Sequence, residues 1–141
     1  MTPRRCLFAI VILALAACDR RDDGHLRVEV NQLVNSEGAM ASAAMARLVP
    51  YGSRALPLME AALHTAKPGG RVNLVVAMRR LGEAEAIPLL LHIAAYDSDE
   101  TVRHEAEWAL RGFARGEDAR AARAKDAMRK LDEIRGSEEA G

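Results

Sequence analysis

The sequence predicts an all-α protein, a short α-α superhelix of about three stacked helix pairs. Apolar residues recur at spacings of three and four through most of the chain, the pattern of a helix with one buried face. Aromatic residues make up only 4% of the chain, which favours closely packed helices over a β-sandwich. A set of residues also returns 32 positions later, and a fixed period indicates stacked repeats. The set is Arg71, Leu74, Ala77, Met78, Leu81 and Gly82, which returns as Arg103, Ala106, Ala109, Leu110, Phe113 and Ala114.

The charge balance argues against a nucleic-acid partner. Twenty basic and twenty acidic side chains give a formal net charge of zero, whereas a nucleic-acid-binding domain usually carries a basic excess or stripe. The length of 141 residues suits a single domain.

Residues 1–17 are predicted to be a signal peptide. Arg4 and Arg5 precede an uncharged stretch, residues 7–17, that is too short to span a bilayer comfortably. The run Leu15-Ala16-Ala17-Cys18 resembles the lipobox of bacterial lipoproteins. That resemblance implies cleavage before the cysteine and its acylation. The alternative is an ordinary signal peptide in which the cysteine is incidental.

A lipid on Cys18 would anchor the mature protein to a cell membrane, facing the periplasm. Two or more acyl chains are needed, because one chain alone binds a membrane only marginally. Asp19 resembles the signal that keeps enteric lipoproteins in the inner membrane. Residues 18–25 are interpreted as the lipidated cysteine and a charged tether.

The repeat domain is predicted to span residues 26–135, followed by a disordered tail over residues 136–141. Leu26, Val28 and Val30 also alternate as a strand would, but a helix is preferred because no partner strand follows. Proline is tolerated in the first turn of a helix, so Pro57 and Pro88 each mark a helix start. Helices are expected near residues 26–34, 39–49, 100–114 and 117–135. A further helix carries Leu56, Met59 and Leu63, and two central helices lie between the turn over residues 67–70 and Asp97.

Short polar segments separate these helices. Lys67-Pro68-Gly69-Gly70 is predicted to be a turn. Ser36 is a cap candidate for the helix that follows it, and Asp97 and Glu100 are spaced as a capping box. The last helix carries one apolar stripe and is otherwise charged, which is typical of the terminal cap of a repeat array.

One run of residues supports a family resemblance. Ala86-Ile87-Pro88-x-Leu90, followed by Asp97-x-Asp99-x-x-Val102-Arg103-x-x-Ala106-x-x-Ala109-Leu110, resembles the HEAT repeat. The resemblance implies paired antiparallel helices in a curved solenoid that serves as a binding scaffold. It also implies that Asp97 and Arg103 tie adjacent repeats together, with Asp99 in the same turn. The first copy departs from the pattern, with Ala66 in place of the aspartate and Ala41 in place of the arginine.

No motif in the sequence predicts catalysis, a cofactor or a metal site. The chain has four histidines, none in a His-Glu-x-x-His arrangement. His104 and Glu107 lie three residues apart and could share a metal, but a solvated helix face explains them as well. A small catalytic or metal-dependent envelope lipoprotein is therefore the alternative hypothesis, and convergence of His64, His92 and His104 would favour it.

A partner-binding surface is the preferred hypothesis for function. The HEAT resemblance implies that the second helix of each pair lines the concave face. If Ile87, Leu90, Leu91 and Ala94 point inward, other apolar and aromatic residues remain at the surface, where they suit protein recognition. The expected partner-binding residues are Leu58, Leu89, His92, Ile93 and Tyr96. Alternatively, Leu89 and Ile93 broaden the core. The sequence thus predicts a lipid-anchored interaction module that binds an unknown envelope protein.

Overall fold

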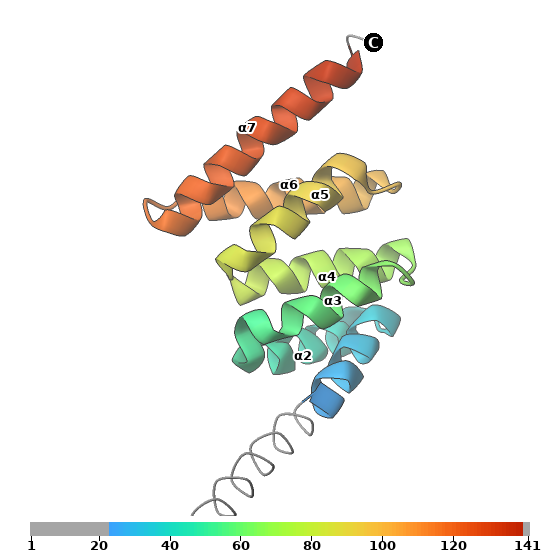
Figure 1. Ribbon diagram of the computed structural model, residues 1–141. Coiled ribbons are helices and arrows are strands. Elements are labelled where there is room, and N and C mark those ends of the chain that lie inside the picture. Colours follow the sequence, from blue (N-terminus) through green and yellow to red (C-terminus); the bar gives the residue numbers. More distant parts are fainter. Residues whose placement is uncertain (1–22, 140–141) are drawn as a thin grey trace, which may run out of the picture.

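The structure of the protein, a computed structural model, describes residues 23–139. No strand occurs among these residues, and the all-α prediction is confirmed. The helices follow one another along the molecule in chain order, so the first described helix and the last helix lie toward opposite ends (Figure 1). The elements are helical residues 23–35, α2 (Gly38–Leu48), η1 (Val49–Ala55), α3 (Leu56–Leu63), α4 (Pro68–Leu81), η2 (Ala84–Ala86), α5 (Ile87–Tyr96), α6 (Glu100–Ala114) and α7 (Ala119–Glu139).

Taken in chain order, the helices make three pairs, α2 with α3, α4 with α5, and α6 with α7. The pairs stack, since α4 packs against α2 as well as α3, and α6 packs against α4, α5 and α7 (Figure 1). Helical residues 23–35 precede the first pair. The prediction of a short solenoid of about three helix pairs is confirmed.

Proline and glycine set several helix boundaries. Pro57 and Pro88 lie in the first turns of α3 and α5, as predicted. Pro68 lies in the first turn of α4. The expected turn over residues 67–70 is therefore wrong for residues 68–70, which are helical. The first turn of a helix needs no N–H from its proline, and the helix therefore continues through both glycines. Gly82 ends α4 with a left-handed φ of 71°.

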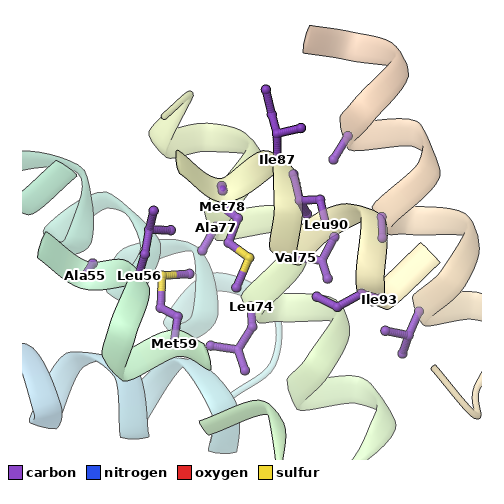
Figure 2. Close-up of a cluster of buried hydrophobic side chains, with 14 of the residues drawn as sticks. Ala55, Leu56, Met59, Leu74, Val75, Ala77, Met78, Ile87, Leu90 and Ile93 are labelled. Carbon is purple, nitrogen blue, oxygen red and sulfur yellow. The ribbon is translucent and has the colours of Figure 1, made fainter. Parts of the chain in front are cut away.

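The core runs through the whole stack as one continuous apolar cluster. Met59 of α3, Leu74 and Met78 of α4, and Leu90 of α5 are fully buried and belong to the cluster drawn in Figure 2. Leu110 of α6 extends the cluster toward the last pair. Each such side chain contributes about 1.5–3 kcal/mol by its burial. The pairs are thus held together mainly by apolar contacts between repeats.

Both ends of the repeat domain differ from the expected boundaries. Residues 23–25 are helical rather than part of a tether, because Leu26 is buried and orders the turn around it. At the other end α7 continues to Glu139, so residues 136–139 are helical and not disordered. Ser137 Oγ donates to the carbonyl of Ile134 at 2.7 Å within this last turn. The expected signal peptide, Cys18 and Asp19 lie outside the described residues.

Asp97 connects two repeats, with a different arginine from the one expected. Its carboxylate accepts hydrogen bonds from Nε and Nη2 of Arg71, each at 2.9 Å. Arg103 instead donates to the backbone carbonyl of Asp97, at 2.7 Å. Arg71 makes the equivalent bond to the carbonyl of Ala66, at 2.9 Å. The arginine of one repeat therefore reaches forward to the aspartate of the next.

Asp99, not Asp97, caps α6. Its Oδ1 accepts a hydrogen bond from the backbone N–H of Val102 at 3.1 Å. Asp97 Oδ1 accepts from the N–H of Asp99 at 2.9 Å and so orders the turn before the cap. The predicted capping box of Asp97 and Glu100 is wrong, because the N-cap residue of α6 lies two positions after Asp97. Ser36 is not a cap either, since α2 starts after Glu37 without a side-chain cap bond.

Candidate binding groove

The residues expected to bind a partner line a groove between α3 and α5. The groove has a volume of about 390 Å³ and opens on the side of the stack formed by these second helices. The turn that follows α5 and the start of α4 close it at one end. Its lining residues are Glu60, Leu63, His64, Arg71, Leu89, His92, Ile93, Tyr96, Asp97 and Ser98.

The helical spacing of α5 places three of the expected residues on one face. Leu89, His92 and Tyr96 follow one another at three and four positions, so they lie along the same side of the helix. Leu89 is half-buried, His92 is exposed, and Tyr96 is 57% exposed. The rings of His92 and Tyr96 stack at a tilt, with centroids 5.2 Å apart. The groove thus combines an apolar floor with two exposed rings that carry polar atoms.

Ile93 is not a surface residue, contrary to the prediction. It is only 4% exposed and belongs to the buried cluster of Figure 2, although its edge forms part of the groove floor. The alternative interpretation, that this residue broadens the core, is correct. Leu91 differs in the other direction: it was expected to be buried in the core, but it is only half-buried. Leu91 instead lines a hollow between α5 and α7, together with Ala122 and Ala127 of α7.

Leu58 does not join the other expected residues. It is half-buried and lines a separate hollow of about 170 Å³, together with Arg27, Val30 and Val34 from the first described helix. Helical residues 23–35 approach α3 at this point. Leu58 therefore faces the N-terminal helix, and the α3 residues that line the groove begin at Glu60.

Sequence reasoning missed the α3 side of the groove. Glu60 and His64 are four positions apart, a spacing that places both on one side of a helix. That spacing was the available signal, but it does not show that α3 faces α5 across the groove. Glu60 and His64 face the groove because α3 and α5 occupy equivalent places in successive pairs. Proximity across repeats depends on the stacking and not on either helix alone.

Arg71 forms a wall of the groove and is held by the protein itself. Its Nε and Nη2 donate to Asp97, and its Nη1 donates to the carbonyl of Ala66. Its side chain is 15% exposed and that of Asp97 is 10% exposed. A ligand would therefore meet the exposed carboxylate of Glu60, the imidazoles and the tyrosine hydroxyl rather than this guanidinium.

Metal binding in the groove is not supported by the arrangement of ligands. The described residues contain no group of three or more His, Cys, Asp and Glu side chains that could hold a metal ion. His64 and His92 share the groove, whereas His104 lines a different hollow on α6. Glu107, the expected companion of His104, forms ion pairs with Arg111 and Arg135. The convergence of three histidines that would favour a metal site does not occur.

Stacked helix pairs with an open groove on the second helices define the class of helical-repeat scaffolds. None of the described helices is long and apolar enough to cross a membrane. The HEAT repeat family matches residues 30–111, more than half of the chain, and the protein belongs to this family. The match ends inside α6, so α7 lies beyond it, at the place of a terminal helix. The chain matches no curated protein and no solved structure.

Membership in the family carries a general expectation about function. HEAT repeats mediate interactions between proteins and are typically not catalytic. The groove agrees with this general role, since it offers apolar and polar contacts on stacked helices.

Proposed function

We propose that this protein is a lipid-anchored interaction module of the bacterial cell envelope, which binds another envelope protein through the groove between α3 and α5. The observation that carries the proposal is the gathering of Leu89, His92 and Tyr96 opposite Glu60 and His64 in one open groove. An exposed tyrosine ring next to aliphatic side chains is typical of protein-binding surfaces.

The composition of the groove favours a peptide or a protein surface over a small substrate. The half-buried Leu89 and Leu63 provide apolar contact area, while the imidazole of His92 and the hydroxyl of Tyr96 can form hydrogen bonds. None of the lining residues forms a nucleophile–base pair in the described structure. The catalytic or metal-dependent alternative is therefore not favoured, and we propose that the protein is not an enzyme and needs no cofactor.

The anchor part of the proposal depends on the first residues of the chain. Leu15-Ala16-Ala17-Cys18 resembles a lipobox, and Asp19 favours retention in the inner membrane. A lipid at this position would hold the repeat domain close to the membrane, because only a few residues separate Cys18 from the helix that contains residues 23–35. Substitution of Cys18 by serine is expected to release the protein from membranes or leave it unprocessed. If the Cys18→Ser variant is still processed and stays bound to membranes after a high-salt wash, Cys18 is not the anchor.

Site-directed crosslinking tests the groove. A photoreactive amino acid in place of Tyr96 should link the protein in intact cells to a distinct partner. The same probe in place of Glu117, an exposed residue outside the groove, should not. Adding Leu89→Ser should suppress the adduct at position 96 if both residues contact one partner. Equal adducts from both probe positions would contradict a specific groove.

A further inference from the structure

Helix α6 presents a second surface that the groove does not use. His104, Trp108, Arg111 and Arg115 follow one another at spacings of four, three and four, so they form one stripe along α6 and its C-cap residue, Arg115. All four are exposed, and Trp108 is the only tryptophan in the chain. Trp108 has 49% of its surface exposed, an unusual position for a large apolar ring.

Trp108 is held in place from the neighbouring repeat. The guanidinium of Arg79 on α4 lies over the indole, 3.8 Å from the ring centroid. The same guanidinium is 3.5 Å from a carboxylate oxygen of Glu105. A cation over an aromatic ring is attracted by the ring's π-face, so the indole is fixed while its free side remains open to solvent. The exposed ring is therefore a preformed feature of the surface.

Basic side chains surround the ring, and the acids between them are paired. Glu107 is 7% exposed and forms ion pairs with both Arg111 and Arg135, while Glu105 pairs with Arg79. The side chains of the first two arginines remain 62% and 40% exposed. Each can therefore approach a further anion. Two arginines around one buried carboxylate leave a net positive charge at this place.

The hollow beside Trp108 indicates which kind of partner fits. It measures about 350 Å³ and is lined by His104, Glu107, Trp108, Arg111 and Arg135, of which only the indole is largely apolar. An apolar peptide side chain would find little to contact there. An array of anionic groups beside an apolar layer would match both the arginines and the ring.

We infer that this stripe docks on an anionic lipid bilayer, with Trp108 at the level of the headgroups and Arg111 and Arg115 next to lipid phosphates. Tryptophan is enriched at membrane interfaces because its ring is apolar and its N–H is polar. Basic residues near an anionic surface each contribute to attraction, which salt weakens. The inference goes beyond the proposed function, since it concerns a different face and does not depend on the partner in the groove.

Fluorescence of Trp108 tests the inference directly, because no other tryptophan contributes to the emission. The full-length protein is mixed with vesicles of phosphatidylcholine, with or without phosphatidylglycerol, and with brominated acyl chains as quencher. We expect a blue shift and quenching on the anionic vesicles that weaken as salt is added. The N-terminal apolar segment can bind both kinds of vesicle, so the readout is the environment of Trp108 and not total binding.

Charge variants supply the second arm of the test. Changing Arg111 and Arg115 to glutamine should weaken the anion-dependent response about fivefold per arginine. Arg123→Gln, the same change on an exposed position of α7, should leave the response unchanged. Circular dichroism checks that each variant is folded, and the salt series on the unmodified protein needs no variant.

Three results would overturn the inference. The first is unchanged Trp108 emission on anionic vesicles. The second is an equal shift on vesicles without phosphatidylglycerol, which would assign the effect to the N-terminal segment. The third is quenching by an acidic peptide such as polyglutamate without any response to vesicles, which would assign the stripe to an acidic protein.

Discussion

At the scale of single residues, Asp97 joins two neighbouring repeats through one carboxylate. Both of its oxygens accept from Arg71, and one also accepts from the N–H of Asp99. Bidentate, charge-assisted pairs of this kind are stronger than neutral hydrogen bonds. Because both side chains are largely buried, removal of one leaves the other with few water contacts.

The first prediction concerns this pair. Asp97→Ala should lower the free energy of unfolding by about 2–4 kcal/mol, since it leaves Arg71 without its counterion. Arg103→Ala removes one charge-assisted bond to a carbonyl and should cost about 1–2 kcal/mol. Arg123→Ala, at an exposed position, should change stability by less than about 0.5 kcal/mol. Urea unfolding measures all three, and equal midpoints for Asp97→Ala and Arg123→Ala would contradict the proposed link between repeats.

Glu107 gives the second prediction at this scale. Burial raises the pKa of its carboxyl, but the hydrogen bond and charge of Arg135, followed by those of Arg111, outweigh burial and leave the pKa below its ordinary value. A carboxyl with a depressed folded-state pKa stabilises the fold above its unfolded pKa, about 4.3. That stabilisation is lost as the pH falls through the lower, folded-state pKa.

Replacing this carboxylate should therefore have a pH-dependent effect. Glu107→Gln should be less stable than the unmodified protein at neutral pH, and the difference should shrink as the pH falls below about 4. Thermal unfolding across a pH series measures the difference. A gap that stays constant from neutral to strongly acidic pH would show that the ion pairs with Arg111 and Arg135 do not stabilise the fold.

At the scale of elements, Gly70 shows what allows α4 to approach the first described helix. A Cβ atom on Gly70 would lie 2.6 Å from the carbonyl oxygen of Val34 and 3.0 Å from one of its methyl groups. Backbone cannot move aside as a flexible side chain can. Asn73 strengthens the same contact, since its Nδ2 donates to the carbonyls of Leu33 and Ser36 at 3.0 and 2.8 Å.

A pair of adjacent glycines makes this contact testable. Gly70→Ala should destabilise the protein by about 1–3 kcal/mol, as overpacking does. Gly69→Ala is the matched control, because a Cβ there meets nothing within 4 Å. Alanine should stabilise that position by about 0.5–1 kcal/mol, since glycine is unfavourable inside a helix. Differential scanning calorimetry compares the two variants, and we expect their changes in stability to have opposite signs. Changes of the same sign would refute the close approach of α4 to the first described helix.

Most of the helices could be predicted because their signals are local. The apolar spacing and the first-turn prolines place α3 and α5, and the 32-residue recurrence gives the repeat. The recurrence does not predict that Arg71, rather than Arg103, pairs with the carboxylate of Asp97. Both arginines fit the pattern, and which one reaches the carboxylate depends on how far one pair is displaced along the next.

The groove was predictable on one side only. Leu89, His92 and Tyr96 share one helix and follow from its period, whereas His64 and Glu60 come from another repeat. Ile93 was misassigned because the period of a helix shows which residues share a face but not how wide the buried face is. The width depends on how α6 and α7 pack around α5, which is a tertiary property.

At the scale of the whole molecule, the two proposed surfaces lie on different helices. The groove uses α3 and α5, the second helices of two pairs, whereas the stripe of His104, Trp108, Arg111 and Arg115 is on α6, the first helix of the last pair, and on its C-cap residue. A domain that contacts the bilayer through α6 could therefore bind a protein through the groove at the same time. A lipid on Cys18 would support this orientation without determining it.

The central claim is that the groove binds a partner protein, and the affinity of a double variant tests it most directly. Leu89→Ser combined with Tyr96→Ser should weaken binding of the protein that crosslinks at position 96 by more than about 2 kcal/mol, roughly thirtyfold. Helical content and melting temperature should change little, because Tyr96 is exposed and Leu89 is only half-buried. Unchanged affinity, or unfolding without a selective loss of binding, would contradict the claim.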